Sequence, residues 1–100
     1  MMAEQMNLLG YIVWQVDRWA WEEINQAILR YKQRTGNEAE VLAYRPGDRA
    51  KVRPLIPDRF GLNFWETDGC TPGFIWVMDN ETFHRYNNRT TSGASVIAWR

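Results

Sequence analysis

A long amphipathic segment between two apolar runs most constrains the fold of this chain. Residues 11–16 (YIVWQV) are apolar on both faces of an extended strand, which is typical of a central strand in a sheet. Apolar side chains then recur at helical spacing in residues 17–35, and residues 41–44 (VLAY) form a second apolar run. Strand, helix and strand in this order predict a βαβ unit with a right-handed crossover.

Residues at its two ends set the bounds of the predicted helix. Asp17 is a candidate N-cap, because its side chain can accept a backbone hydrogen bond from the first turn. Glu22 and Glu23 suit the positive N-terminal end of the helix dipole. Gly36 follows the last apolar residues and is expected to end the helix.

A helical wheel separates the two faces of this helix. The predicted core stripe consists of Ala20, Trp21, Ile24, Ala27, Ile28 and Tyr31. Trp19 and Leu29 fall on the opposite face, among polar residues. Three explanations compete for this pair: Trp19 folds back over the preceding strand or residues 2–9, the pair belongs to a protein interface, or it lines a small-molecule pocket.

The second half of the chain predicts further strands. Residues 62–67 and 74–78 are strand-like and are joined by the Gly- and Pro-rich residues 68–73, which together predict a hairpin. The remaining elements are single helical turns in 48–53 and 79–86, a polar loop in 87–94 and a terminal strand in 95–99.

These elements predict an α+β fold for one domain spanning residues 1–100. It has a mixed sheet of about five strands, with one long helix (about 17–35) packed on one face. A βαβ start is followed by a hairpin and a terminal strand, and a split βαβ layout is the alternative.

Six tryptophans in one hundred residues must find places in this fold. One helix covers one sheet face, so some of Trp14, Trp65, Trp76 and Trp99 are expected on the open face. Either a loop or a partner would then cover them. We therefore expect self-association, with a dimer as the simplest closed form.

The charges are balanced overall but grouped along the chain. Twelve Lys and Arg face twelve Asp and Glu, which argues against a general DNA-coating protein. Residues 45–59 are basic, and their candidate ligand-binding side chains are Arg45, Arg49, Arg53 and Arg59. Arginine binds phosphates and carboxylates in a forked geometry, so this segment is a candidate for a nucleic acid or phosphorylated ligand. Pairing with the acidic residues 60–83 of the same chain is the alternative.

Catalytic candidates are few. Cys70 is the single cysteine, so no internal disulfide can form, and His84 is the single histidine. Cys70 with His84, or His84 oriented by Glu81, would be the nucleophile–base arrangement. The sequence predicts neither a metal site nor a cofactor, because no ligand cluster and no Gly-rich phosphate loop appears.

Three functions remain open. The first is a non-catalytic interaction module that self-associates or docks on a protein through Trp19, Leu29, Trp65 and arginines. The second is binding of nucleic acid or a phosphorylated ligand by residues 45–59 and the C-terminal arginines, and the third is a small enzyme around Cys70 and His84. No signal peptide or membrane span fits the N-terminal residues, so a cytoplasmic protein without membrane contact is expected.

Overall fold

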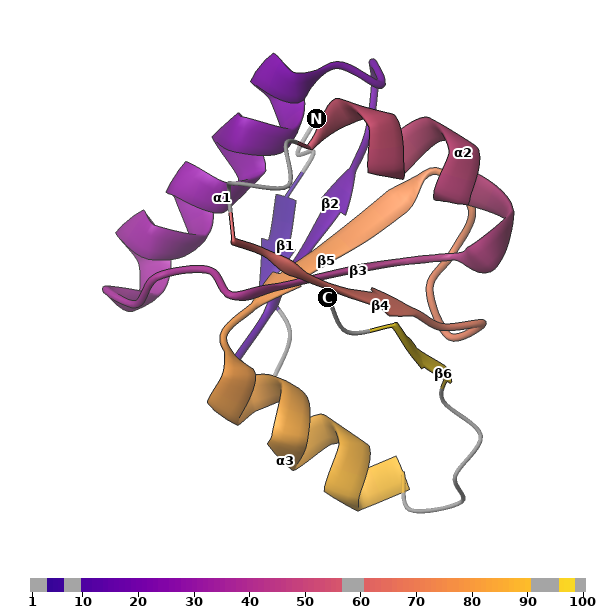
Figure 1. Cartoon of the computed structure of the whole chain (residues 1–100). Coiled ribbons are helices and arrows are strands. Elements are labelled where there is room, and N and C mark those ends of the chain that lie inside the picture. The colour runs from indigo at the N-terminus through magenta and orange to yellow at the C-terminus, as the bar shows by residue number, and fades with distance from the viewer. Residues whose placement is uncertain (1–3, 7–9, 57–60, 91–95, 99–100) are drawn as a thin grey trace.

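The protein folds as a mixed β-sheet with helices on both of its faces (Figure 1). A computed structural model describes residues 4–6, 10–56, 61–90 and 96–98. The strands are β1 (Glu4–Met6), β2 (Ile12–Gln15), β3 (Val41–Tyr44), β4 (Asn63–Glu66), β5 (Phe74–Met78) and β6 (Val96–Ala98). Their order in the sheet is β1-β2-β5-β3-β4-β6. Among these described strands, β3 and β4 pair in parallel and the other neighbours are antiparallel.

Helices cover the sheet in two layers. The helix α1 (Trp21–Thr35) and the helical segment η1–α2–η2 (Pro46–Asp48, Arg49–Val52 and Arg53–Leu55) lie on one face, and α3 (Asn80–Thr90) lies on the other (Figure 1). The crossovers from β2 to β3, β3 to β4 and β5 to β6 all step in the same direction across the sheet. Because β5 runs opposite to β2 and β3, a right-handed crossover places α3 on the opposite face.

The predicted hairpin is wrong. β4 and β5 follow one another in sequence but do not pair, because β5 inserts between β2 and β3. The βαβ unit β2–α1–β3 is therefore split by an antiparallel strand, as in the alternative layout. The turn at 68–73 carries the chain past the end of β3, a path that its Gly and Pro residues allow as readily as a tight hairpin.

The predicted strand number and the single helix are also wrong. β2, β5, β3 and β4 form the centre of the sheet, β6 pairs with β4, and the unpredicted strand β1 pairs with β2. The second face needs its own helix because large apolar side chains line it. α3 continues through residues 87–90, which were expected to be loop, and residues 91–94 lie outside the described part.

The start of α1 differs from the prediction at Asp17. The N-cap is Ala20, and no side-chain cap hydrogen bond is present. Instead, the Glu23 carboxylate accepts hydrogen bonds from the backbone N–H of Asp17 (2.7 Å) and of Arg18 (2.8 Å). The carboxylate therefore holds residues 17 and 18 outside the helix. Trp19 consequently precedes the helix, is half-buried and packs against the core.

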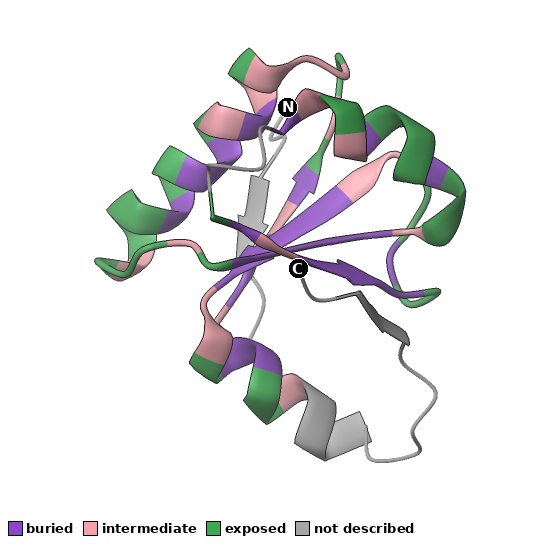
Figure 2. Cartoon of the chain, in the orientation of Figure 1, coloured by how far each residue is buried: buried purple, intermediate pink, exposed green. Residues whose placement is uncertain are grey.

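The rest of α1 agrees with the wheel, except that Trp21, which was predicted in the core stripe, is half-buried and packs against the core. Ile24, Ala27, Ile28 and Tyr31 are buried against the sheet (Figure 2), and Leu29 is 52% exposed on the opposite face. Gly36 ends the helix in a left-handed conformation (φ 78°), and its N–H donates to the Lys32 carbonyl. None of the helices in the described residues is both long and apolar enough to cross a lipid bilayer.

The three tryptophans in the described strands of the sheet do not lie on an open face. Trp14 belongs to the core between the sheet and α1, whereas Trp65 and Trp76 belong to the core beneath α3. The latter two join Tyr11, Phe83 and Tyr86 in an aromatic cluster with ring centroids 4.9–6.0 Å apart. Trp99 lies outside the described residues. The expectation of exposed aromatic side chains on the sheet is therefore wrong for Trp14, Trp65 and Trp76.

Candidate functional site

A polar pair lies at the carboxyl ends of the parallel strands β3 and β4. Tyr44 and Glu66 are the last residues of these strands and are partners in the register. The Tyr44 hydroxyl donates a 2.8 Å hydrogen bond to Oε2 of Glu66. Both residues are buried, with exposed fractions of 0% and 8%. A buried carboxylate needs such partners, because leaving it unpaired in the interior is costly.

Two arginines of the segment η1–α2–η2 reach this pair. The Nε of Arg49 lies 3.3 Å from Oε2 of Glu66, and an Nη1 hydrogen of Arg53 is donated to the Tyr44 hydroxyl across 3.4 Å. The two arginines are four residues apart, so consecutive turns bring them to the same side of the helical segment. The guanidinium of Arg53 also stacks over the ring of Phe64, 4.4 Å from its centroid. Arg49 and Arg53, both predicted from sequence, are therefore brought together.

Burial governs the protonation of the Tyr44 hydroxyl. It raises the pKa of Tyr44 above its ordinary value of 10.0, and the Arg53 hydrogen bond only partly opposes this. The hydroxyl therefore stays protonated at neutral pH and donates to Glu66. Such a group orients its neighbours and does not serve as a base.

Arg45, also predicted from sequence, stabilises a turn. Its Nη1 donates to the carbonyl of Asp68 (3.1 Å) and lies 3.4 Å from that of Cys70. Asp48 supports the same region, because its Oδ2 accepts a 2.9 Å hydrogen bond from the N–H of Gly73. These contacts join the start of η1 to the loop between β4 and β5.

The charges of this region are sorted by depth. The side chains of Arg49 and Lys51 are 61% and 57% exposed, whereas those of Glu66 and Asp48 are 11% and 9% exposed. Lys51 also lies over the half-buried Trp19, with Nζ 5.8 Å from the ring centroid. Cations therefore face the solvent while the carboxylates lie beneath them. The outer surface of η1–α2–η2 is positively charged although the whole chain has a formal net charge of zero.

The catalytic candidates Cys70, Glu81 and His84 do not contact the Tyr44–Glu66 pair in any hydrogen bond or ion pair of the described residues. Cys70 is completely buried, and its Sγ donates to the carbonyl of Phe74 at 3.2 Å. Burial raises the pKa of this thiol to about 12, and the nearby Asp48 charge adds to the increase. A buried, protonated thiol is a poor nucleophile. Glu81 pairs with Arg85 at 3.7 Å, and the ring of the exposed His84 lies 5.3 Å from that of its neighbour Phe83.

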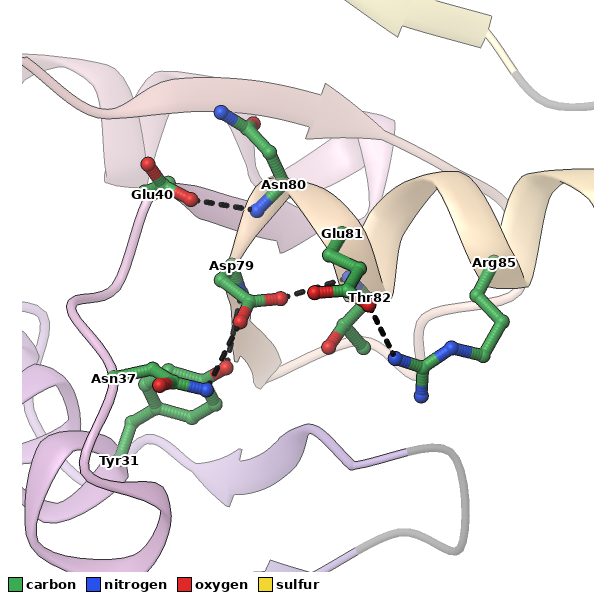
Figure 3. A network of polar contacts seen from close by, with 8 residues as sticks. All are labelled: Tyr31, Asn37, Glu40, Asp79, Asn80, Glu81, Thr82 and Arg85. Atoms are coloured by element: carbon green, nitrogen blue, oxygen red, sulfur yellow. Dashed lines mark hydrogen bonds and ion pairs between the residues drawn. The ribbon is translucent and has the colours of Figure 1, made fainter.

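A second polar cluster lies at the start of α3 (Figure 3). Oδ1 of Asp79 accepts a 2.7 Å hydrogen bond from the N–H of Thr82, and Oδ2 accepts one from Nδ2 of Asn37 at 3.2 Å. The N–H of Asp79 donates to the Tyr31 hydroxyl at 3.1 Å. Asp79 thus caps α3 and ties it to the end of α1.

Glu40 completes this attachment. It accepts a 2.9 Å hydrogen bond from the N–H of Asn80 and donates its own N–H to the Met78 carbonyl. The carboxylates of Glu40 and Asp79 therefore accept hydrogen bonds from backbone N–H groups at the start of α3. Within the described residues, no group of three or more His, Cys, Asp or Glu side chains could hold a metal ion.

The other predicted binding residues do not form one surface. Trp65 is completely buried beneath α3, and Trp19 is half-buried. Leu29 is a large apolar side chain that is 52% exposed on α1. Arg59 lies outside them. None of these positions within the described residues provides an exposed aromatic anchor. Self-association stays a prediction.

Sequence reasoning missed Tyr44, Glu66 and Asp48 as members of the site. Glu66 carried a usable signal, since an acid that directly follows the aromatic residues Phe64 and Trp65 in a strand is expected to find a buried partner. Its partner Tyr44 could not be identified, because the sequence does not reveal that β3 and β4 are neighbours in parallel register.

Comparisons with known proteins provide no relative for this chain. No protein-family model, curated protein or solved structure matches it.

Proposed function

We propose that this protein is a small non-catalytic binding module that holds a phosphate-bearing ligand on the outer surface of η1–α2–η2. The observation that carries the proposal is the sorting of charge by depth around Arg49 and Glu66. The buried carboxylate of Glu66, at the end of the central strand β4, holds the side chain of Arg49, which is exposed to solvent. Arginine held in this way is oriented before any ligand arrives, which lowers the entropic cost of binding.

The local charge supports an anionic ligand. Residues 45–55 carry the four cations Arg45, Arg49, Lys51 and Arg53 and the carboxylate of Asp48. Counted together with the buried Glu66 of β4, they have a net charge of +2. Opposing carboxylates cancel only half of the positive charge, so the segment attracts anions at short range. Charge attraction of this kind weakens as salt is added.

The surroundings of the reactive groups support the absence of catalysis in this proposal. The Cys70 thiol is buried, and its pKa is raised to about 12. Tyr44 is also buried, and burial raises its pKa. Neither group is exposed to a ligand on the outer surface of η1–α2–η2.

Retention on phosphocellulose tests the proposal. The wild-type protein should bind the resin at low salt and elute as salt rises, whereas Arg49→Gln/Arg53→Gln should elute much earlier. The matched control is Arg30→Gln/Arg34→Gln, which removes two exposed arginines from α1 and gives the same net charge. Thermal unfolding of each variant checks that it is folded.

Two results would contradict the proposal. Failure of the wild-type protein to bind at low salt would exclude a phosphate site of useful affinity. An equally early elution of the Arg30→Gln/Arg34→Gln control would show that overall charge, and not the η1–α2–η2 surface, causes retention.

A further inference from the structure

Contacts in the candidate site link the two arginines through a row of oxygen atoms. Arg53 donates to the Tyr44 hydroxyl, this hydroxyl donates to Glu66, and Glu66 pairs with Nε of Arg49. The two middle residues belong to paired central strands. The sheet therefore determines where both guanidinium groups lie relative to each other.

Within the part of the chain that the structure describes, the polar contacts of Arg49 and Arg53 with the Tyr44–Glu66 pair engage only one nitrogen of each guanidinium. A guanidinium carries five N–H donors in a planar fork. The contact of Arg49 with Glu66 engages Nε, so its four Nη hydrogens are not used in that contact. Arg53 uses Nη1 for Tyr44, and its contact with the ring of Phe64 restricts the position of its fork. Two forks on consecutive turns are thus held by the same hydrogen-bonded pair, Tyr44 and Glu66.

We propose that the group held by Arg49 and Arg53 is a terminal phosphate, that is, a phosphomonoester. This inference rests on the proposed function and narrows its ligand class. A fork that binds in bidentate fashion contacts two oxygens of the phosphate, so two forks that bind different pairs of oxygens on one phosphorus engage three unesterified oxygens. A monoester offers three and a diester offers two. The monoester charge of about −1.5 to −2 at neutral pH also matches the net charge of the segment.

Titration of the full-length ¹⁵N-labelled protein with two probes tests this inference by NMR. Phenyl phosphate is a monoester, whereas an oligothymidylate without terminal phosphates contains diesters alone. Both are added at equal phosphate concentration and constant ionic strength, and the backbone and arginine Nε–H signals are followed. Phenyl phosphate should bind more tightly per phosphate and shift signals of residues 44–55 and 66.

Conservative variants separate the contribution of the guanidinium fork to binding from the contribution of its positive charge. Arg49→Lys and Arg53→Lys keep the positive charge but lose the fork, so each should weaken phenyl phosphate binding about tenfold. The control Arg85→Lys lies on α3, on the other face of the sheet, and should bind like the wild type (Figure 1). The amide spectrum of each variant shows whether it is folded.

The outcomes distinguish this inference from the proposed function. Oligothymidylate binding as tightly per phosphate as phenyl phosphate would overturn the monoester assignment and leave the phosphate-binding module intact. Unchanged affinity in both folded lysine variants would overturn the role of the forks. Binding of neither probe by the wild type would overturn the proposed function itself.

Discussion

Tyr44 and Glu66 stand side by side at the ends of the parallel strands β3 and β4, joined by a buried 2.8 Å hydrogen bond. This bond links the sheet to the helical segment above it, because Arg53 and Arg49 attach to its two members. The pair therefore contributes to the stability of the fold as well as to the geometry of the candidate site.

A double-mutant cycle should show that the pair is coupled. Tyr44→Phe removes the donor and leaves the buried Glu66 with one partner fewer, so it should lower the free energy of unfolding by about 1–3 kcal/mol. Glu66→Gln in the Tyr44→Phe background should cost less than in the wild type, with a coupling of about 0.5–3 kcal/mol. Urea unfolding followed by tryptophan fluorescence measures all four proteins. Strictly additive effects would contradict the bond.

Gly36 and Gly47 provide a matched test of helix termination. A Cβ would meet no atom within 4 Å at either position, but only Gly36 has a positive φ (78°). Gly36→Ala should therefore destabilise the protein by about 1 kcal/mol through backbone strain. Gly47→Ala should leave stability unchanged or raise it by about 0.4–1 kcal/mol, since the unfolded chain loses entropy. Equal effects in thermal unfolding would contradict the αL cap.

Asp79 should make a share of the stability dependent on pH. Burial raises the pKa of Asp79, but its hydrogen bonds from Thr82 and with Tyr31 outweigh this and bring the pKa below the ordinary value of 3.8. A lowered pKa in the folded state means that the stabilisation is present above 3.8 and is lost as the pH falls through the lower folded value.

Asp79→Asn should remove this share of the acid sensitivity. Asparagine can still cap α3, so the variant should remain folded at neutral pH. Urea midpoints measured at neutral pH and at about pH 3 should differ less for the variant than for the wild type. The same pH dependence in both proteins would show that the charge of Asp79 does not stabilise the start of α3.

Much of the α1 side of the fold could be predicted from sequence. The helical period in residues 24–31 and the glycine after the last turn are local signals, and both are confirmed. The start of α1 was not predictable in the same way. The Glu23 side chain accepts hydrogen bonds from the backbone of Asp17 and Arg18. This contact competes with the use of Asp17 as N-cap, and the sequence alone favours neither arrangement.

The topology could not be predicted, because it depends on contacts between distant residues. The turn residues at 68–73 indicate a reversal of the chain but not which strand the chain meets next. Insertion of β5 between β2 and β3 buries both of its faces, a placement that its apolar run FIWVM allows. The same uncertainty hid the site, because Tyr44 and Glu66 become neighbours only through the pairing of β3 with β4.

The chemistry of Cys70 gives the last prediction. Its thiol is completely buried and its pKa is raised to about 12, mainly by burial. The native protein should therefore react very slowly with iodoacetamide at neutral pH, because the thiolate is the reacting species. Reaction in urea should be fast and complete, and mass spectrometry counts the added groups. As a control, Leu29→Cys places a thiol at a position that is 52% exposed and should react in the native state. Rapid native modification of Cys70 would show an accessible thiolate and revive the catalytic hypothesis around this residue.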